Sequence, residues 1–580
     1  MNYQPELSIN EFIRLPTTVD LIVLLTDNFR RYIEERPWIR IGAELDGGYA
    51  VLYVDTRDLD QIVEDFGGGT IAFFPRIMSP LDSRANAAAG ISQVTDQPFL
   101  GYDGTGVLIG IIDTGIDLTL PAFRREDGGS KILSLWDQTA GDDAGDDDGD
   151  GNGGDGGDRP LFGRVYGADE INALAADGAA APGFPGYDEN GHGTFLASVA
   201  AGIEPGTYEG AAPGADIIAV KLRRARSFYV NSYLLSPDDP YLYESSDFML
   251  GVDFVMREAG RLGRPAVVCV GLGSNFSAHD GNTLLEDYLS FLSERPGRAF
   301  ACAAGNEANA RHHTQGRIER TGNTGTVSLR VGRRGASFTV SLYSDAFEKM
   351  SVSVSSPTGE VLPRVPFRSG LSISTDFVLE NSRIFLQYFR GSSNSIIIGF
   401  RDATEGVWDI TVYGDSIVGG EYHAWLPVTG QVDESVEFLR PVPEYTVTYP
   451  ATAMRVVTCG AYDDADGGLY VGSSWGPTRL PRISPDLAAP GVNVRGVYPF
   501  GYGTMTGTSA AAAVTAGAAA LLMEWGIVGG ALPQMSGDMI RSMLIGGARR
   551  ENGMSYPNVR WGYGELDLYG AFEALRETNT

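Results

Sequence analysis

Cysteine is scarce in this chain of 580 residues, which holds only three. Cys269, Cys302 and Cys459 each lie in an apolar run typical of a strand. Such residues are expected to be buried free thiols, and three cysteines provide no disulfide framework. The first 20 residues also lack a basic segment followed by an apolar one, so no secretory signal peptide is expected. Together these features favour an intracellular protein.

Basic residues and long apolar runs are also few. Lys and Arg number 44 against 74 Asp and Glu, which gives a formal net charge of −30 at pH 7. A charge of this sign argues against nucleic acid and against anionic membrane surfaces as partners. The longest apolar run, residues 510–523, is shorter than the roughly 20 residues of a membrane-spanning helix, so no membrane insertion is expected.

Part of the negative charge lies in one glycine-rich tract. Asp146, Asp148, Asp150 and Gly151 match the first half of a calcium-binding loop, because hard oxygen ligands at this spacing suit Ca²⁺. Gly157, however, stands where a closing bidentate Glu is expected. The tract is therefore predicted to be a solvated, flexible loop. No cofactor is required, and a structural calcium ion stays open as an alternative.

Four of the five histidines show no spacing that is typical of a metal site. His312 and His313 are adjacent, so on a regular strand their side chains would face opposite ways, and no third ligand is apparent. His279 and His423 are isolated in the sequence. We expect all four to be structural, and no metal site is predicted.

Ser509 follows a Gly-Thr pair and precedes a run of alanines that continues as an apolar helix. A serine at the start of a helix can act as a nucleophile, because glycine permits close approach and the helix N-terminus favours developing negative charge. Taken alone, the same residues also describe an ordinary capped helix start. The interpretation therefore depends on partners elsewhere in the chain.

Three such partners stand in short motifs of the same kind. Asp113 ends an apolar strand-like run before a glycine turn, and His192 follows Gly191 before a helix of small residues. Asn306 follows an Ala-Ala-Gly turn. An acid, a base, an amide donor and a serine are the groups that acyl transfer needs. In this order along the chain they resemble the subtilisin-like serine proteases (subtilases).

The resemblance implies roles for these residues. Ser509 would attack the scissile carbonyl, His192 would act as general base and then acid, and Asp113 would orient His192. Asn306 would donate to the oxyanion with the Ser509 amide. The substrate-binding residues that the resemblance implies are Gly271, Leu272, Gly273, Ala303, Ala304 and Gly305. An extended substrate would pair with the first three as an added strand.

The fold class expected is α/β, a subtilisin-like fold with a parallel central sheet. Residues 1–82 have strand-like runs at 21–25, 49–54 and 70–74 and helix-like runs at 29–35 and 59–66. They are expected to form a ferredoxin-like prosegment that acts as chaperone and inhibitor, with processing between Arg76 and Ala87. The catalytic domain would comprise residues 83–316 and 430–580. Alternating strands within 317–429 predict an inserted all-β jelly roll, whose role would be packing rather than substrate recruitment.

Local phrases narrow the resemblance further: Leu135–Thr139, the stretch from Gly305 to His313 and Trp561–Tyr569 are similar to the Csp germination proteases of clostridial spores. That resemblance implies a self-processing endopeptidase, cytoplasmic or spore-associated, that cleaves a protein precursor such as a cortex-lytic proenzyme. Its partners would be the protein substrate and its own cleaved prosegment. Two alternatives remain, a protease-shaped binding or signalling protein whose cleft stays filled, and an intracellular subtilase with another substrate.

Overall fold

The computed structural model describes residues 7–578, apart from 67–72, 76, 81–86, 96–99, 142–159, 178–179 and 481. The calcium-like tract lies outside the described residues. So does most of the expected processing region, of which the backbone of residues 77–80 is described.

The centre of the molecule is an eight-stranded sheet with seven parallel strands and one antiparallel edge strand, β7. Runs of aliphatic residues build it, because a parallel sheet is covered on both faces. In spatial order the strands are β27 (Leu487–Pro490), β26 (Val457–Tyr462), β14 (Arg298–Ala303), β12 (Ala266–Val270), β5 (Leu108–Asp113), β10 (Asp216–Lys221), β6 (Ile132–Asp137) and β7 (Arg164–Gly167).

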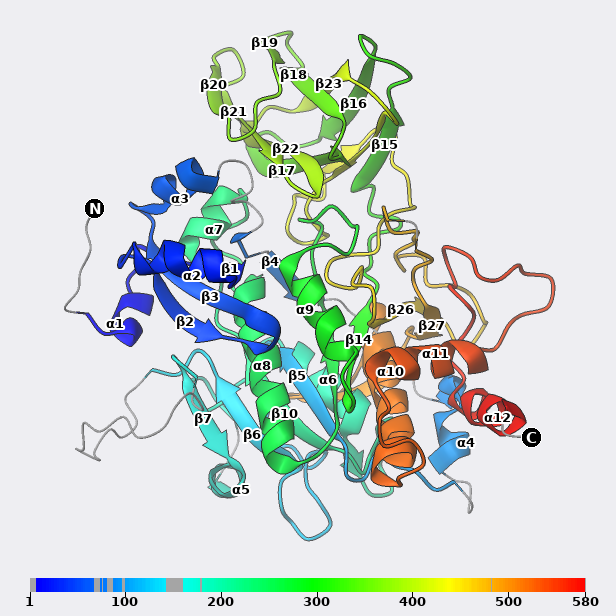
Figure 1. Cartoon of the computed structure of the whole chain (residues 1–580). Coiled ribbons are helices and arrows are strands. Elements are labelled where there is room, and N and C mark those ends of the chain that lie inside the picture. Colours follow the sequence, from blue (N-terminus) through cyan, green and yellow to red (C-terminus); the bar gives the residue numbers. More distant parts are fainter. Residues whose placement is uncertain are drawn as a thin grey trace.

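Helices cover both faces of this sheet (Figure 1). Ile109 and Ile111 of β5 belong to the core that includes α6 (His192–Ala201) and α10 (Thr508–Met523). Leu108 and Ile112 face the other core, with α8 (Ser245–Leu262) and α9 (Leu284–Ser293). The remaining helices of this part are η3 (Ala87–Ala89), α4 (Ile91–Thr95), α5 (Ala168–Asp177), α7 (Ser227–Ser232), η4 (Glu524–Val528), α11 (Gly537–Gly547) and α12 (Leu568–Thr578). The expected α/β fold with a largely parallel central sheet is confirmed.

Short antiparallel strands lie outside the central sheet. They are β8 (Ile203–Glu204) with β9 (Tyr208–Glu209), β28 (Val494–Tyr498) with β29 (Gly501–Met505), and β11 (Tyr243–Glu244) and β13 (Leu272–Gly273), which flank β4 (Ile77–Pro80). The helix Thr508–Val528 is long and apolar enough to cross a membrane by length and composition, and 78% of its most apolar stretch is buried inside the protein. A helix at the centre of a globular core meets the same criterion.

Residues 8–66 form an α/β unit, here called the N-terminal unit. Its elements are α1 (Ile9–Ile13), β1 (Thr18–Leu24), α2 (Asp27–Glu34), β2 (Arg40–Glu44), η1 (Asp46–Gly48), β3 (Tyr49–Asp55) and α3 (Leu59–Phe66), and the sheet order is β1-β3-β2. The sequence did not indicate β2. Of the expected last strand, residues 70–72 lie outside the description, and Phe73 and Phe74 are not in a strand. One face of the unit shares a core with α8 and α9.

Residues 313–438 form a separate all-β unit, here called the β unit, with its own apolar core between two antiparallel sheets. The strands begin and end a few residues outside the expected bounds of 317–429. They are β15 (His313–Arg317), β16 (Thr324–Val331), β17 (Ala336–Asp345), β18 (Lys349–Ser355), β19 (Val361–Val365), β20 (Ser372–Phe377), β21 (Ser382–Arg390), β22 (Ser393–Ala403), β23 (Gly406–Ser416), β24 (Glu421–Trp425) and β25 (Val436–Phe438). Figure 1 shows the unit projecting at the top, beside the N-terminal unit.

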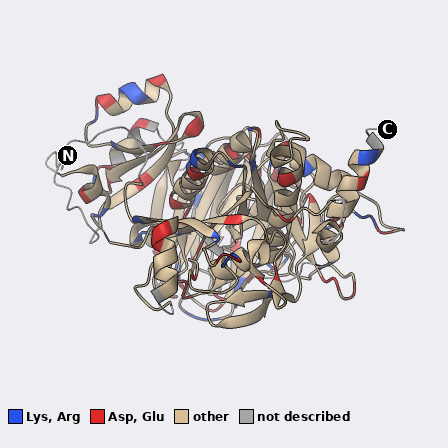
Figure 2. Cartoon of the chain, turned by 90° about the horizontal axis from the view of Figure 1, so that it is seen from below, with Lys and Arg blue, Asp and Glu red and all other residues tan. Residues whose placement is uncertain are grey.

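The charged side chains are distributed over the whole molecule. In the view of Figure 2, Lys and Arg are interspersed with Asp and Glu along the described elements. Many of these residues form local ion pairs, such as Arg30 with Glu44 and Arg549 with Glu565. Among the described residues, charges of both signs are therefore interspersed, while the aspartates of the glycine-rich tract lie outside this description.

Candidate active site

The predicted site residues come together at one edge of the central sheet. Asp113 is the last residue of β5, Gly271 directly follows β12, and Asn306 comes three residues after the end of β14. These three strands are neighbours in the sheet and run parallel. Their carboxyl ends therefore meet at the same edge, where ligands of open α/β sheets bind.

Asp113 and His192 form a direct hydrogen bond. Nδ1 of His192 lies 2.7 Å from Oδ1 of Asp113, and both residues are buried. His192 is the first residue of α6, and Gly191 before it adopts a φ of 84°, a left-handed conformation that glycine adopts without strain. A side chain on Gly193 would lie 2.3 Å from the carbonyl oxygen of Gly115. The glycines on either side of His192 thus allow the two turns to touch.

Ser509 reaches the same place from the start of α10. Its Oγ donates a 3.1 Å hydrogen bond to the carbonyl oxygen of Gly271. A Cβ built on Gly271 would lie 3.0 Å from Cε1 of His192, 3.5 Å from Cβ of Ser509 and 2.5 Å from a methyl group of Leu196. His192 and Ser509 therefore both flank Gly271, and the crowding by Leu196 explains the glycine at this position. Asp113, His192 and Ser509 form one constellation.

Asn306 is held by Thr508, the residue before Ser509. The Thr508 amide donates to Oδ1 of Asn306 at 2.9 Å, and the Thr508 hydroxyl lies 3.2 Å from the same oxygen. That hydroxyl also accepts from the Gly305 amide at 3.0 Å. With Oδ1 engaged in this way, the amide nitrogen of Asn306 is the group left to donate to an oxyanion beside Ser509.

Asp188 is a part of the site that the sequence did not reveal. This buried carboxylate accepts from the Thr114 hydroxyl at 2.7 Å and from the Gly191 amide at 2.8 Å. Its other oxygen accepts from the Thr194 amide at 2.9 Å and hydroxyl at 2.7 Å. It thereby ties the turn after Asp113 to the start of the His192 helix. The only available signal was an acid four residues before the histidine, which is weak.

Replacing Asp188 by Asn is expected to lower the free energy of unfolding by about 1–3 kcal/mol, because the new NH₂ group would face N–H donors that lose their acceptor. Self-cleavage, proposed below, should slow about tenfold as His192 shifts relative to Ser509. Urea unfolding and a time course of cleavage measure both effects. Asp238→Asn, at an exposed acid, is the matched control. Equal stability of the Asp188→Asn variant and the wild type would contradict a positioning role.

The predicted substrate wall carries a strand of the chain itself. β4 lies between β11 and β13 and is antiparallel to both. Ser79 is opposite Gly273 and Pro80 is opposite Leu272, so the C-terminal end of β4 points toward Gly271 and the Ser509 hydroxyl. A polypeptide thus already occupies the position of an added substrate strand.

The other predicted wall residues are buried. Ala303 ends β14, and the carbonyl oxygen of Ala304 accepts from the Thr448 amide at 2.8 Å. Gly305 has a φ of 105°, and a side chain there would lie 2.6 Å from a methyl group of Thr448. This turn is therefore fixed from behind, which positions Asn306.

Three of the four remaining histidines gather around Trp425, between the β unit and the part of the chain that contains the central sheet. The rings of His279, His313 and His423 stack on Trp425 at centroid distances of 4.3, 4.8 and 5.5 Å. Burial lowers the pKa of His279 to about 4, of His313 to about 3 and of His423, which also faces His313, to about 2. These rings are therefore neutral packing groups at neutral pH. His312 bonds instead to the buried Glu307, at 2.8 Å. Within the described part of the chain, no group of three or more His, Cys, Asp or Glu could hold a metal ion.

Comparison with known proteins agrees with this geometry. The sequence pattern of the Subtilase family matches residues 104–423 and 439–564. Because this match spans well over half of the chain, the protein belongs to the subtilase family of serine proteases.

Individual relatives are more distant. The solved structure of the CspB protease of Clostridium perfringens is similar, with 27% identity, a TM-score of 0.72, and coverage of 85% of this chain and 97% of that one. The serine protease AprX of Bacillus subtilis is 28% identical over 147 residues, 22% of this chain and 30% of its own length. The subtilase-type proteinase RRT12 of Saccharomyces cerevisiae is 28% identical over 109 residues, 18% of this chain and 21% of its own length. The chain thus aligns with less than a third of either curated relative.

Proposed function

We propose that the protein is a serine endopeptidase that first cleaves its own chain between the N-terminal unit and the subtilase fold. The observation that carries this proposal is β4, a strand of the same chain bound antiparallel to β13 and directed toward Ser509. The cut is expected just beyond Pro80, within the range of residues 76–87 that the sequence suggests. An Asp–His pair beside a serine hydroxyl supplies the base that such a reaction needs.

The reaction follows the roles assigned to the four residues. His192 accepts the proton of the Ser509 hydroxyl as Oγ attacks the carbonyl carbon, and Asp113 stabilises the resulting imidazolium. Asn306 and the Ser509 amide donate to the oxyanion. His192 then returns the proton to the leaving amine, and water hydrolyses the acyl-enzyme in the reverse sequence. Gly271 to Gly273 hold the substrate backbone through β13.

In this proposal the N-terminal unit, residues 1–82, is a ferredoxin-like prosegment that stays bound after cleavage. It shares a core with α8 and α9, and one buried ion pair, between Asp20 and Arg226, joins it to the protease part, which is the central sheet with the helices around it. The unit of residues 317–429, with its flanking strands, is proposed as a jelly-roll insertion. The physiological substrate would be a protein precursor. The likeness to the CspB protease makes a cortex-lytic proenzyme of a germinating spore the first to test.

A binding or signalling protein with a permanently filled cleft is the second candidate. It is favoured by the burial of Ser509, which is 0% exposed while β4 lies in the cleft. An intracellular subtilase that acts on a different substrate would share the first step of the proposed reaction. Self-cleavage therefore distinguishes the proposed self-processing endopeptidase from the binding or signalling protein. It does not distinguish it from an intracellular subtilase with a different substrate.

The test is intact mass spectrometry of the purified wild type beside Ser509→Ala. We expect the wild type to appear as two fragments, divided between residues 80 and 87, and the variant to remain uncut. The fragments should co-elute in gel filtration if the N-terminal unit stays bound. A wild type that remains full length would overturn the proposal and leave the binding protein as the better description. Cleavage of the variant would show that another protease makes the cut.

A further inference from the structure

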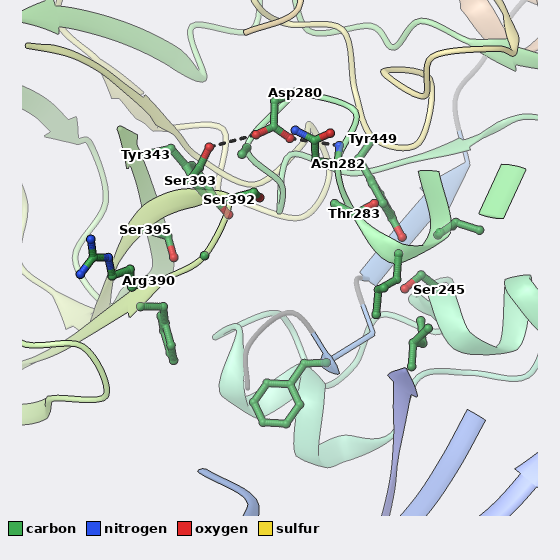
Figure 3. A pocket seen from close by; sticks show the side chains of 17 residues that line it. Ser245, Asp280, Asn282, Thr283, Tyr343, Arg390, Ser392, Ser393, Ser395 and Tyr449 are labelled. Atoms are coloured by element: carbon green, nitrogen blue, oxygen red, sulfur yellow. Dashed lines mark hydrogen bonds between the residues drawn. The ribbon is translucent and has the colours of Figure 1, made fainter. Parts of the chain in front are cut away.

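A cavity of about 160 Å³ lies where the N-terminal unit, the protease part and the β unit meet. Phe74 lines it from the N-terminal side, and Ser245 and Tyr449 line it from the protease part. The turn between β21 and β22 closes it, with Phe389 and Ser393 in the wall. Figure 3 shows Ser393 and Ser395 of the β unit across the cavity from Thr283 and Tyr449.

The strands of the substrate wall lead into this cavity. Ile77, the first residue of β4, is opposite Glu244, and the next residue along that side is Ser245. On the other side, Ser274 follows β13 and exchanges two backbone hydrogen bonds of 2.9 and 3.0 Å with Tyr449. A chain bound like β4 therefore continues in its N-terminal direction past Ser245 and Tyr449. Phe74, three residues before Ile77, lines the cavity as this direction requires.

The turn of the β unit is fixed in place. Ser393 donates a 2.9 Å hydrogen bond to Asp280, which is 5% exposed. Arg479 donates to Ser393 at 3.2 Å and pairs with Asp345 of the β unit at 3.1 Å. A wall held by such contacts is organised before a ligand arrives, which reduces the entropy cost of binding.

The aromatic part of the wall favours an apolar side chain at the position of Phe74, whereas serine, threonine and aspartate residues line much of the rest of the cavity. Phe74 and Phe389 also line a second, adjoining cavity of about 450 Å³, to which α7 contributes Phe228 and Tyr229. The ring of Phe74 contacts that of Tyr229 edge to face, with centroids 6.0 Å apart. The segment of the chain that leads into β4 thus packs an aromatic ring on Tyr229 of α7, and Phe389 of the β unit lines the same two cavities.

We propose that the cavity closed by the β21–β22 turn is a recognition subsite for the N-terminal continuation of the polypeptide being cleaved, selective for a large apolar residue at the position of Phe74. The β unit then takes part directly in substrate recognition, beyond the packing role that the sequence indicated. This inference rests on the proposed self-cleavage, in which Phe74 of the chain itself borders the subsite and is the first side chain presented to it.

To test this proposal, the protein is made in a short pulse of cell-free synthesis. The first-order loss of full-length chain is then measured over time. Phe389→Ala should slow self-cleavage about tenfold, because a pocket wall loses its apolar contact with the substrate. Phe74→Ala should slow it to a similar extent. The double variant should be no slower than either single one, since both remove the same interaction. Phe389→Leu, which keeps an apolar side chain, should recover most of the rate.

Phe347→Ala is the matched control, because this phenylalanine of the β unit is 58% exposed and lines neither cavity. It should cleave within about twofold of the wild type. Equal rates for Phe389→Ala and Phe347→Ala would overturn the subsite, and so would strictly multiplicative slowing in the double variant. A wild type that never cleaves would instead overturn the proposed function, and the subsite with it. Thermal melting of each variant identifies slowing that comes from unfolding.

Discussion

Replacing Asn306 by alanine is expected to slow self-cleavage about 10²–10³-fold, since the loss of one oxyanion donor costs about 3–4 kcal/mol of transition-state stabilisation. The structure explains why one residue matters so much. Oδ1 of Asn306 is engaged by the amide and the hydroxyl of Thr508, which leaves the amide nitrogen for the reacting carbonyl. Self-cleavage is intramolecular, so its first-order rate constant measures the chemical step directly.

Thr508→Val provides a graded comparison with Asn306→Ala. Valine keeps the backbone N–H that donates to Asn306 but removes the hydroxyl that links Asn306 to the Gly305 amide. We expect a smaller effect, about three- to tenfold, because Asn306 would be less firmly oriented. A rate for Asn306→Ala within a few-fold of the wild type would show that other donors carry the oxyanion. Full-length variants with unchanged melting temperatures exclude misfolding as the cause.

The family and the α/β fold could be predicted from the sequence because each candidate catalytic group stands in a short local pattern. Asp113 and Asn306 each follow an apolar run that becomes a central strand, and both lie beside glycines that permit a tight turn. A residue that directly follows a buried parallel strand can be placed at the carboxyl edge of the sheet from the sequence, because parallel strands end at a common edge. The structure accordingly brings Asp113, His192, Gly271, Asn306 and Ser509 together.

Other features could not be predicted because they depend on contacts between distant segments. Asp188 is an ordinary acid in the sequence, and its function appears only when Thr114 and Thr194 are seen at its two oxygens. The stacked histidines depend on strand register, since His313 is opposite Trp425 and His423 is opposite Tyr343. β4 pairs through only two residues on each side, which is too short to carry a periodic pattern.

The N-terminal unit is expected to dissociate from the cleaved protein when Arg226 is replaced by methionine. Arg226 lies in the protease part and pairs with Asp20 of β1 and, at 2.6 Å, with Glu244. Asp20 and Glu244 are both completely buried. Removing one partner of a buried ion pair costs about 3–5 kcal/mol, because the remaining charge has neither water nor a counterion.

The charge states within this cluster decide which second change should restore binding. Burial opposes the ionisation of Asp20, but the charges of Arg226 and Arg223 and the hydrogen bonds from Glu244 and Ser246 together outweigh it and lower the pKa of Asp20. Burial raises the pKa of Glu244 well above its usual range, so of the two carboxyl groups Asp20 is the one that the cluster favours in its charged form. Methionine at 226 therefore leaves Asp20 as the uncompensated group. Asp20→Asn in the same chain removes that charge and should recover much of the lost binding.

Gel filtration of cleaved protein measures this effect as the fraction of N-terminal fragment that co-elutes with the protease part. Arg30→Met is the matched control, since its pair with Glu44 lies within the N-terminal unit, is about half exposed at both side chains and should contribute little to stability. Full co-elution of the Arg226→Met fragments would show that apolar packing alone retains the unit. If Arg226→Met releases the N-terminal fragment and Asp20→Asn restores its binding, this ion pair is what retains the unit. Arg226 is then the position at which a substitution opens a cleft that is otherwise stably filled.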